Sequence, residues 1–298
     1  MPIDLKGKPI AITGASSGIG AATALACARA GMPVAIGARR KDKIEELVAR
    51  IRSEGGRAIG MCTDVADPAQ CRELIEATVN EFGSIYAVYA NAGYGFEKPV
   101  HEMLDSDIRA MFEVNFFGTL NTIRPALEHI RKAPWSASGE KRGHVLICSS
   151  CLSKMFLPYF SVYSASKAAQ NHIGRAMNLE LRDEGIAVTT VHPVSTRTEF
   201  SSTTERLSGN GTLIAHSPDM FTQTAEFVAA RTVACLRRPR PELWTGTLGH
   251  FVRFGMSVCQ LLPWVPDAAL AGMVKRRKAS YRSSSPGVAT AAPSPNAG

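Results

Sequence analysis

The stretch Thr13-Gly14-Ala15-Ser16-Ser17-Gly18-Ile19-Gly20 follows a short apolar run, residues 9–12, and opens a helix-forming pattern that begins at Gly18. Glycines at these positions allow a tight turn and bring the backbone close to a pyrophosphate, which then lies at the positive N-terminal end of the helix. Some glycine-rich turns only pack a helix on a strand, but the place of this one in the first strand–helix unit favours phosphate binding. The stretch therefore predicts a dinucleotide site that includes Gly14, Ser16, Ser17, Gly18, Ile19 and Gly20.

Beyond this turn, apolar runs without polar alternation are separated by helical patterns as far as residue 193. The later runs are residues 33–36, 58–61, 87–90, 144–147 and 187–191. The helical patterns are residues 18–30, 41–54, 68–82, 105–131 and 162–184. Strands of this composition are buried on both faces. Six such strands predict an α/β fold, a Rossmann-like doubly wound parallel sheet flanked by helices, which binds ligands beyond the carboxyl ends of its strands.

The chain divides into three predicted parts. Residues 1–250 form a dinucleotide-binding and catalytic domain, residues 251–282 a C-terminal helical extension, and residues 283–298 a disordered tail that is rich in Ser, Ala and Pro. Within the domain, the polar residues 132–142 predict an exposed loop, and the Ser-, Thr- and Gly-rich residues 194–218 predict a lid beside the site.

The positive charge of the chain lies at its C-terminal end. The 298 residues include 34 Lys or Arg and 26 Asp or Glu. From Arg231 onward there are ten bases and two acids, so this region carries the whole net charge of +8 and the first 230 residues are neutral. A neutral main domain argues against nucleic acid as a partner.

The first residues of the sequence do not resemble a secretory signal peptide. Met1 is followed by Pro-Ile-Asp-Leu-Lys instead of an apolar signal core, and the number of cysteines, seven, is odd, so we expect reduced thiols in a cytoplasmic protein. The longest apolar stretch, residues 251–265, is interrupted by Arg253, Gln260 and Pro263, whereas a spanning helix needs about 20 apolar residues. We therefore expect no transmembrane segment. We also expect no metal site, because no His, Cys, Asp and Glu residues share metal-ligand spacing.

The residues after the second predicted strand, Ala38-Arg39-Arg40, bear on the choice of dinucleotide. An NAD site usually has an acid at the position of Ala38, where it holds the ribose hydroxyls, whereas a guanidinium suits the 2'-phosphate of NADP. Arg39 and Arg40 therefore predict NADP(H) as the cofactor, although a solvated basic turn would have the same sequence. Asp64 and Val65 complete this end of the predicted cofactor site. Asp64 either caps the next helix or hydrogen-bonds the adenine amino group.

Tyr163-Ser164-Ala165-Ser166-Lys167 lies in a predicted helix, and the four-residue spacing places Tyr163 and Lys167 on one face. A phenol has an ordinary pKa near 10, but an ammonium about 4 to 6 Å away lowers that pKa by roughly 1 to 3 units and makes the pair a usable acid/base. The spacing alone is also typical of an amphipathic helix edge. Its meaning therefore depends on the motifs around it.

Taken together, the motifs resemble those of the compact short-chain dehydrogenases/reductases over about residues 5–200. The matching motifs, in order, are Thr13-Gly14-x-x-x-Gly18-x-Gly20, Asn91-Ala92-Gly93, Asn115, Ser149-Ser150, Tyr163-x-x-x-Lys167, and Pro193 followed by Thr198. In that family the catalytic serine lies thirteen residues before the tyrosine, and this spacing selects Ser150 over Ser149.

The resemblance implies a role for each matching residue. Tyr163 would be the general acid/base, and Lys167 its electrostatic partner and a ribose ligand. Ser150 would donate to the substrate carbonyl oxygen, and Asn115 would hold a proton-relay water. The remaining matches would contact or support the cofactor, and they are Asn91, Ala92, Gly93, Pro193 and Thr198.

Three features depart from the family pattern. Val194 follows Pro193 where the family usually has Gly, and Ser153 replaces a glycine often found three residues after the catalytic serine. The predicted loop 132–142 is also longer than the usual connection. None of these departures removes a reacting group.

These observations predict an oxidoreductase that reversibly reduces a carbonyl to an alcohol by hydride transfer from NADP(H). The residues near the expected pocket are mainly apolar or aromatic, which suits a small-molecule hydrophobic ketone as substrate. The alternative is that these side chains only pack the loops. The residues are Tyr94, Cys151, Leu152, Phe156, Leu157 and Tyr159. The alternative function is a catalytically silent NADP-sensing regulator or scaffold on the same fold. The intact catalytic residues argue against that alternative. We expect the chain to form a homodimer or homotetramer.

The predicted C-terminal extension combines apolar and basic residues. Leu261-Leu262-Pro263-Trp264-Val265-Pro266 leads into a predicted helix, residues 267–278, that ends in Lys275-Arg276-Arg277-Lys278. Apolar groups beside a basic cluster suit peripheral attachment to an anionic membrane surface. The same apolar groups could instead pack over the subunit's own pocket or against a dimer partner, with the bases solvated.

Overall fold

The computed structural model describes residues 1–135, 140–208, 222–246, 249–262 and 264–284. The strands of its central sheet are β1 (Ile10–Thr13), β2 (Val34–Ala38), β3 (Ala58–Cys62), β4 (Ala87–Ala90), β5 (Gly143–Cys148), β6 (Ile186–His192) and β9 (Glu242–Trp244). They are parallel and lie in the order β3-β2-β1-β4-β5-β6-β9. The chain runs outward from β1 in both directions, so the topological switch point lies between β1 and β4. The predicted doubly wound fold is confirmed, and β9 is a strand that the sequence did not predict.

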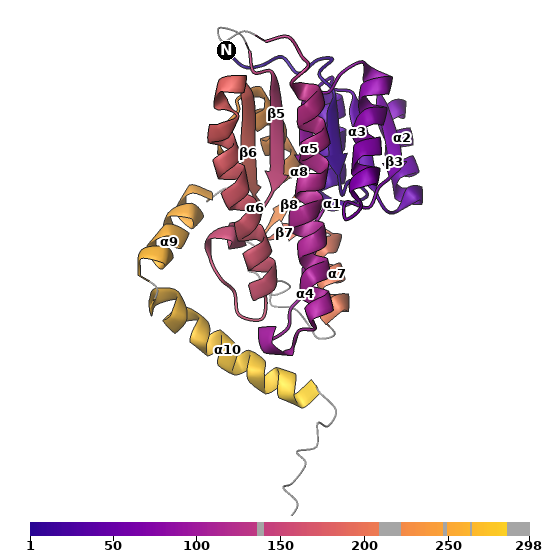
Figure 1. Cartoon of the computed structure of the whole chain (residues 1–298). Helices are drawn as coiled ribbons and strands as arrows, with labels where there is room; N and C mark the ends of the chain where they lie inside the picture. The colour runs from indigo at the N-terminus through magenta and orange to yellow at the C-terminus, as the bar shows by residue number, and fades with distance from the viewer. Residues whose placement is uncertain (136–139, 209–221, 247–248, 263, 285–298) are drawn as a thin grey trace, which may run out of the picture.

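Helices cover both faces of the sheet (Figure 1). One face carries α1 (Gly18–Arg29), α2 (Lys41–Ser53) and α8 (Ala225–Arg237), and the other carries α3 (Pro68–Phe82), α5 (Gly118–Ile130) and α6 (Ser161–Glu180). Successive strand residues alternate between the two layers, since Ile10 and Ile12 pack with α1 and Ala11 packs with α5. Both faces of the sheet are therefore apolar, which explains why the strand sequences lack polar alternation.

The predicted helix 105–131 changes its winding near the middle. It comprises α4 (Asp105–Phe112), a π-helical turn η2 (Glu113–Phe117) and α5. Wider turns of this kind are frequent at functional sites. Asn115 lies in this turn, and its side chain is completely buried.

The predicted lid after β6 has regular structure where it is described. It holds β7 (Thr196–Arg197) and α7 (Glu199–Ser208), and β7 pairs in parallel with β8 (Gln223–Thr224) in a second, small sheet. Residues 209–218 of the lid lie outside the described residues. In the predicted loop 132–142, the described residues form neither helix nor strand, and residues 136–139 lie outside the description.

Two helices form the C-terminal extension. α9 (Gly249–Leu261) and α10 (Trp264–Ser284) project away from the body of the molecule (Figure 1). α10 is longer than the predicted helix 267–278 and includes residues 283 and 284 of the predicted tail, whose remainder lies outside the described residues. Across the described ranges, no helix combines the length and the apolar character needed to span a bilayer.

Candidate active site

A cavity of about 1200 Å³ opens beyond the carboxyl ends of the strands, where the fold class predicted a ligand site. The predicted site residues that line it are Gly14, Ser16, Ser17, Gly18, Ile19, Arg39, Arg40, Asp64, Val65, Asn91, Ala92, Gly93, Ser150, Tyr163, Lys167, Pro193 and Thr198. Gly20 and Asn115 do not line the cavity and lie behind its wall. One cavity thus joins the glycine-rich turn to the predicted catalytic residues.

The turn after β1 has a backbone that requires glycine. Gly14 has φ +65°, and a Cβ there would lie 2.6 Å from the Cα of Ala92. The Asn91 amide donates to the carbonyl oxygens of Thr13 (3.1 Å) and Gly14 (3.2 Å) and so ties the end of β4 to the turn. Gly20 packs against the same amide, since a Cβ at Gly20 would lie 2.6 Å from Asn91 Nδ2. The N-terminus of α1 has no side-chain cap, so its first backbone N–H groups are available to a phosphate.

Arg40, in the turn between β2 and α2, is held by two hydroxyls and a carboxylate at the cavity wall. Its Nη2 donates to Ser16 Oγ (3.0 Å) and Ser17 Oγ (2.8 Å) and forms an ion pair with Glu199 Oε2 at 2.8 Å. Ala38 occupies the end of β2, so no acid stands at that position. Arg40 therefore presents a guanidinium to the cavity at the end of β2, together with two hydroxyls and one carboxylate.

Asp64 does not cap the helix that follows it. The side chain of Asp67 accepts from the backbone N–H of Ala69 at the start of α3, and Asp64 Oδ1 accepts from the N–H of Ala66. Of the two roles predicted for Asp64, helix capping is therefore wrong. Asp64 lines the cavity, and its contact with adenine stays a prediction.

Tyr163 and Lys167 lie one turn apart on α6 and are both buried. Lys167 Nζ lies 5.6 Å from the centre of the Tyr163 ring and donates to the carbonyl oxygen of Cys148 (2.8 Å). Burial lowers the pKa of Lys167 to about 8. Burial raises the pKa of Tyr163 above its ordinary value, and Lys167 is not among the groups that lower it. The lowering expected from Lys167 is therefore not found, and the phenol is protonated at neutral pH.

The two serines after β5 have different partners. Ser149 donates its hydroxyl to the main-chain carbonyl of Lys167 (2.8 Å) and so links β5 to α6. Ser150 Oγ accepts from the N–H of Leu152 (3.1 Å), which leaves its own proton for another acceptor. The Ser150 hydroxyl also lowers the pKa of Tyr163, against the larger effect of burial. The Ser150 hydroxyl therefore lies within hydrogen-bonding reach of the Tyr163 phenol, where the predicted role places it.

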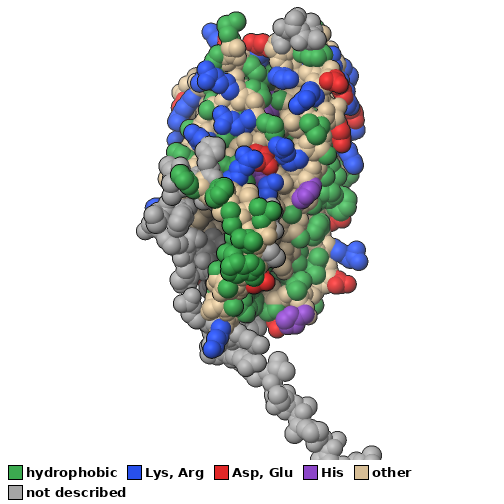
Figure 2. All heavy atoms as spheres, turned by 90° about the vertical axis from the view of Figure 1, so that its left-hand side faces the viewer, with side chains coloured by type: hydrophobic (Ala, Val, Ile, Leu, Met, Phe, Trp, Pro, Cys, Tyr) green, Lys and Arg blue, Asp and Glu red, His purple; other side chains and the backbone are tan. Residues whose placement is uncertain are grey.

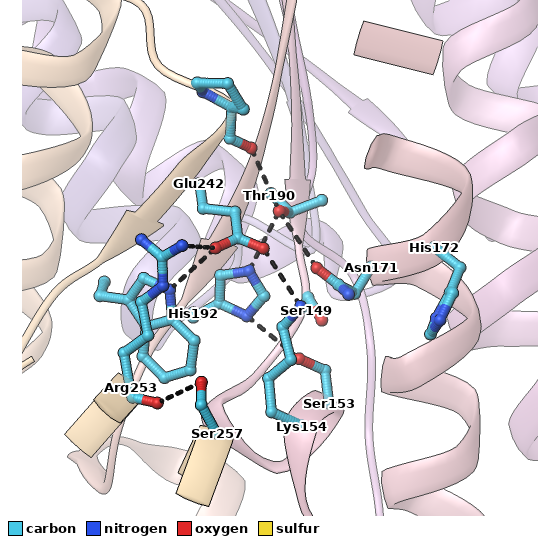
Figure 3. A network of polar contacts seen from close by, with 12 residues as sticks. Ser149, Ser153, Lys154, Asn171, His172, Thr190, His192, Glu242, Arg253 and Ser257 are labelled. Carbon is cyan, nitrogen blue, oxygen red and sulfur yellow. Dashed lines mark hydrogen bonds and ion pairs between the residues drawn. The ribbon is translucent and has the colours of Figure 1, made fainter. Parts of the chain in front are cut away.

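A buried histidine, which Figure 3 shows beside Ser153 and Thr190, holds the backbone of Ser150. His192 Nδ1 lies 3.0 Å from the Ser150 carbonyl oxygen and 3.1 Å from Ser153 Oγ, while Nε2 lies 3.0 Å from Thr190 Oγ1. The imidazole stacks on the Trp244 ring with centroids 4.7 Å apart. Ser153, a departure from the family pattern, thus has a partner of its own, and this pairing was missed at the level of sequence.

Glu242 of β9 extends the same network toward the C-terminal helices (Figure 3). Its carboxylate forms ion pairs with Lys154 (3.2 Å) and Arg253 (3.6 Å). Lys154 ends the 3-10 turn η3 (Cys151–Lys154), which follows Ser150, and Arg253 lies on α9. The turn that carries the serine is therefore tied to the C-terminal extension through one nearly buried carboxylate.

Asn115 is hydrogen-bonded through both its side chain and its backbone. Its Oδ1 accepts from the N–H of Tyr94 (3.0 Å), and its Nδ2 donates to the Tyr94 carbonyl (2.9 Å) and to Ser166 Oγ (2.9 Å). Its main-chain carbonyl accepts from Gln170 Nε2 (2.6 Å). Asn115 therefore joins η2 to α6 and to the loop after β4, and its role as the holder of a relay water stays a prediction.

Aromatic rings that the sequence did not single out flank the phenol. The ring centroid of Tyr163 lies 4.4 Å from that of Phe160 and 5.5 Å from that of Phe200. Of the residues expected in the apolar pocket, the ones that line the cavity are Tyr94, Cys151, Leu152 and Leu157. Phe156 and Tyr159 do not line it, and the prediction for these two residues is wrong.

Cys148 and Cys151 flank the serine pair with a Cys-x-x-Cys spacing. This spacing was also missed at the level of sequence. Both are free thiols. Burial raises the pKa of Cys151 to about 11, so its thiol is protonated at neutral pH and is a poor nucleophile.

A doubly wound sheet with such a cavity at its switch point is typical of dinucleotide-binding oxidoreductases. Within that class, residues 8–207 match the family model described as short chain dehydrogenase. The chain belongs to the short-chain dehydrogenase/reductase family, and the predicted family is confirmed.

Similar proteins agree with this assignment. An uncharacterized oxidoreductase of Listeria monocytogenes is 33% identical over 201 residues, which are 67% of this chain and 78% of that protein. The 11-beta-hydroxysteroid dehydrogenase 1A of Arabidopsis thaliana is 30% identical over 236 residues, 78% of this chain and 65% of that protein. The crystal structure of a short chain dehydrogenase from Burkholderia cenocepacia in complex with NADP has a TM-score of 0.69 and 27% identity, and the match covers 82% of this chain and 99% of that one. The chain is therefore an oxidoreductase of this family.

Proposed function

We propose that this chain is an NADP(H)-dependent reductase that reversibly converts a carbonyl to an alcohol. One observation supports this above all, namely that Tyr163 and Ser150 line the same cavity as Arg40 and the glycine-rich turn. The cavity wall fits a phosphorylated dinucleotide, because Gly14 allows close backbone approach and Arg40 presents a guanidinium beside Ser16. When bound, the dinucleotide supplies or accepts the hydride.

The protein's own side chains manage the proton. Because burial raises its pKa, Tyr163 keeps its proton at neutral pH and donates it to the carbonyl oxygen. Ser150 donates to the same oxygen, since its Oγ accepts from the Leu152 N–H and its hydroxyl lies beside the Tyr163 phenol. The Lys167 ammonium, anchored by the Cys148 carbonyl, stabilises the phenolate as it forms.

The substrate we propose is a hydrophobic ketone. The apolar side chains that line the cavity around Tyr163 are Tyr94, Leu152, Leu157, Phe160 and Phe200, with Met273 from α10. The relative named as an 11-beta-hydroxysteroid dehydrogenase supports a substrate of this chemical kind. Because Met273 belongs to α10, the C-terminal extension contributes to the pocket.

Turnover of a ketone panel tests this function. Aliphatic, aromatic and polycyclic ketones, including a steroid ketone, are offered with NADPH and with NADH to the full chain and to Tyr163→Phe. Reduction of the hydrophobic members, lost in Tyr163→Phe, supports the proposal. Binding of NADPH without turnover of any member supports the silent regulator instead.

We further propose that the C-terminal helices attach the protein to an anionic lipid surface. Figure 2 shows apolar side chains gathered on the face that carries α9, with Lys and Arg side chains beside them. Four apolar side chains of α9 and α10 are largely exposed, namely Phe251 (75%), Phe254 (70%), Leu261 (79%) and Trp264 (66%). They are therefore not covered by their own subunit, and the sequence of α10 adds Lys275-Arg276-Arg277-Lys278. The alternative is that a second copy of the chain covers these exposed side chains, and a test must distinguish this dimer from lipid binding.

A further inference from the structure

The ion pair between Arg40 and Glu199 connects two segments that are distant in the chain. Arg40 lies between β2 and α2, and Glu199 is the first residue of α7, directly after Thr198. Both residues line the cavity, and Figure 1 shows α7 beyond the carboxyl ends of the strands. The pair therefore reaches from the nucleotide-binding end of the cavity to the segment that follows β6.

The Glu199 carboxylate uses the donors that a phosphate would need. Arg40 Nη2 lies 2.8 Å from Glu199 Oε2 and donates to Ser16 Oγ and Ser17 Oγ. Hydrogen bonds from Arg40, the larger contribution, and from Ser17 hold the pKa of Glu199 below its ordinary value. Lys43 is the other cation whose charge lowers that pKa. Glu199 is therefore an anion at neutral pH, held by a guanidinium and a hydroxyl, the donor types that also bind phosphate.

We propose that Glu199 is a specificity-determining residue, an internal competitor that occupies the 2'-phosphate subsite and limits the preference for NADP(H) over NAD(H). This inference rests on the proposed function, in which Arg40 binds the 2'-phosphate. A phosphate monoester carries about 1.5 to 2 negative charges at neutral pH, so it outcompetes a carboxylate for Arg40 and repels it. NADP(H) must therefore break the Arg40–Glu199 pair, whereas NAD(H) leaves it in place.

The segment that carries Glu199 also reaches the substrate end of the cavity. Phe200 follows Glu199 in α7, and its ring lies 5.5 Å from that of Tyr163. The main-chain N–H of Phe200 also donates to Thr198 Oγ1 (3.2 Å). Glu199 is therefore adjacent in the chain to a ring that packs on the phenol.

Equilibrium titrations of the full chain with NADPH, NADH, 2'-AMP and 5'-AMP test the proposal. The variants are Glu199→Gln, Arg40→Ala, the double variant, and Glu205→Gln as a matched control that removes an exposed acid from the same helix. Because the Arg40–Glu199 pair is about half exposed, Glu199→Gln should increase the affinity for NADPH and for 2'-AMP by about two- to fivefold. The affinities of Glu199→Gln for NADH and 5'-AMP, and all affinities of the control variant, should change by less than 1.5-fold. The gain should shrink at high salt and in the Arg40→Ala background.

The outcomes that overturn the proposal are distinct. If NADPH binds more tightly than NADH through Arg40, and Glu199→Gln leaves both affinities unchanged, the competition is wrong and the proposed cofactor preference stands. If Glu199→Gln weakens the binding of NADH, the proposal is also wrong. Glu199 then accepts hydrogen bonds from the ribose hydroxyls, in place of the acid absent at Ala38. If the parent binds both cofactors equally and Arg40→Ala changes neither, the proposed NADP(H) preference and this inference are both wrong.

Discussion

The ring Nδ1 of His192 lies 3.0 Å from the carbonyl oxygen of Ser150, so a histidine outside the cavity holds the backbone of the residue predicted to donate a hydrogen bond to the substrate carbonyl. Burial keeps the pKa of this imidazole well below its ordinary value, and the ring is neutral at neutral pH. A neutral ring has one N–H to donate, and stacking on Trp244 sets the plane in which it points.

His192→Gln should therefore lower kcat for ketone reduction by about ten- to a hundredfold while NADPH binding changes little, because a small displacement of Ser150 spoils the geometry of reaction. His144→Gln is the control, since His144 is also fully buried but bonds Thr189 (2.8 Å) on β6 instead of the serine turn. Steady-state kinetics and thermal unfolding are measured for both variants. Equal losses of kcat in the two variants would show that only general stability is affected.

Tyr163→Phe should abolish most of the reduction, by about 10² to 10⁴-fold, because the variant has no phenolic proton to transfer. The ring remains, so NADPH affinity should stay within a factor of about two. Tyr86→Phe removes a different buried phenol, one that precedes β4 at the opposite end of that strand from the cavity, and should keep full activity. Turnover of Tyr163→Phe within threefold of the parent rate contradicts the assignment.

Arg40→Ala should reduce kcat/KM with NADPH by about 10- to 100-fold and leave the NADH value within twofold, because charge-assisted hydrogen bonds to the 2'-phosphate are lost. Arg39→Ala should have a smaller effect, since the structure places Arg40 and not Arg39 on Ser16 and Ser17. Steady-state kinetics of both variants with NADPH and with NADH show which of the two arginines contributes more to the use of NADPH. A larger loss in Arg39→Ala reverses this assignment.

Reduction should slow as the pH rises through about 8, the value to which burial lowers the pKa of Lys167. Below that pH the ammonium is present and favours the phenolate, and above it the charge is lost. Lys167→Arg should flatten this limb, because a guanidinium stays charged. A pH profile of kcat/KM without a basic limb in the parent contradicts the role of Lys167.

The same shift in pKa affects stability in the opposite sense. Between pH 8 and about 10.4 the unfolded chain keeps a proton on Lys167 that the folded chain releases. The contribution of Lys167 to the free energy of unfolding therefore rises with pH in that window. Denaturant titrations at several pH values, compared with Lys167→Met, measure this contribution.

The double variant Leu261→Ser, Trp264→Ser should reduce binding to vesicles that contain phosphatidylserine, because it removes two largely exposed apolar side chains of the extension. Leu179→Ser changes a similarly exposed leucine on α6 and is the control. Co-sedimentation is measured at low and high salt with anionic and with neutral vesicles. Loss of a dimer in gel filtration, without any vesicle binding by the parent, identifies a second copy as the occupant instead.

Much of the fold and part of the site could be predicted from local sequence signals. The runs that became β1 to β6 are continuous and apolar, and the glycine-rich turn lies between the first run and a helical pattern, so their order implies the sheet. Tyr163 and Lys167 share a helix, and their spacing alone places them one turn apart. β9 was missed because it has three residues, Glu242–Trp244, and its burial comes from pairing with β6.

Residue order along the chain implied the doubly wound sheet, the glycine-rich turn and the Tyr163–Lys167 pair, because each depends on neighbours within a few residues. Tertiary packing alone decided that Glu199 meets Arg40, that His192 holds Ser150, and that burial raises the pKa of Tyr163. These contacts join segments whose separation in the chain says nothing about their distance in space. A pKa depends on the water and charge that surround a group, and both are known only once the chain has folded.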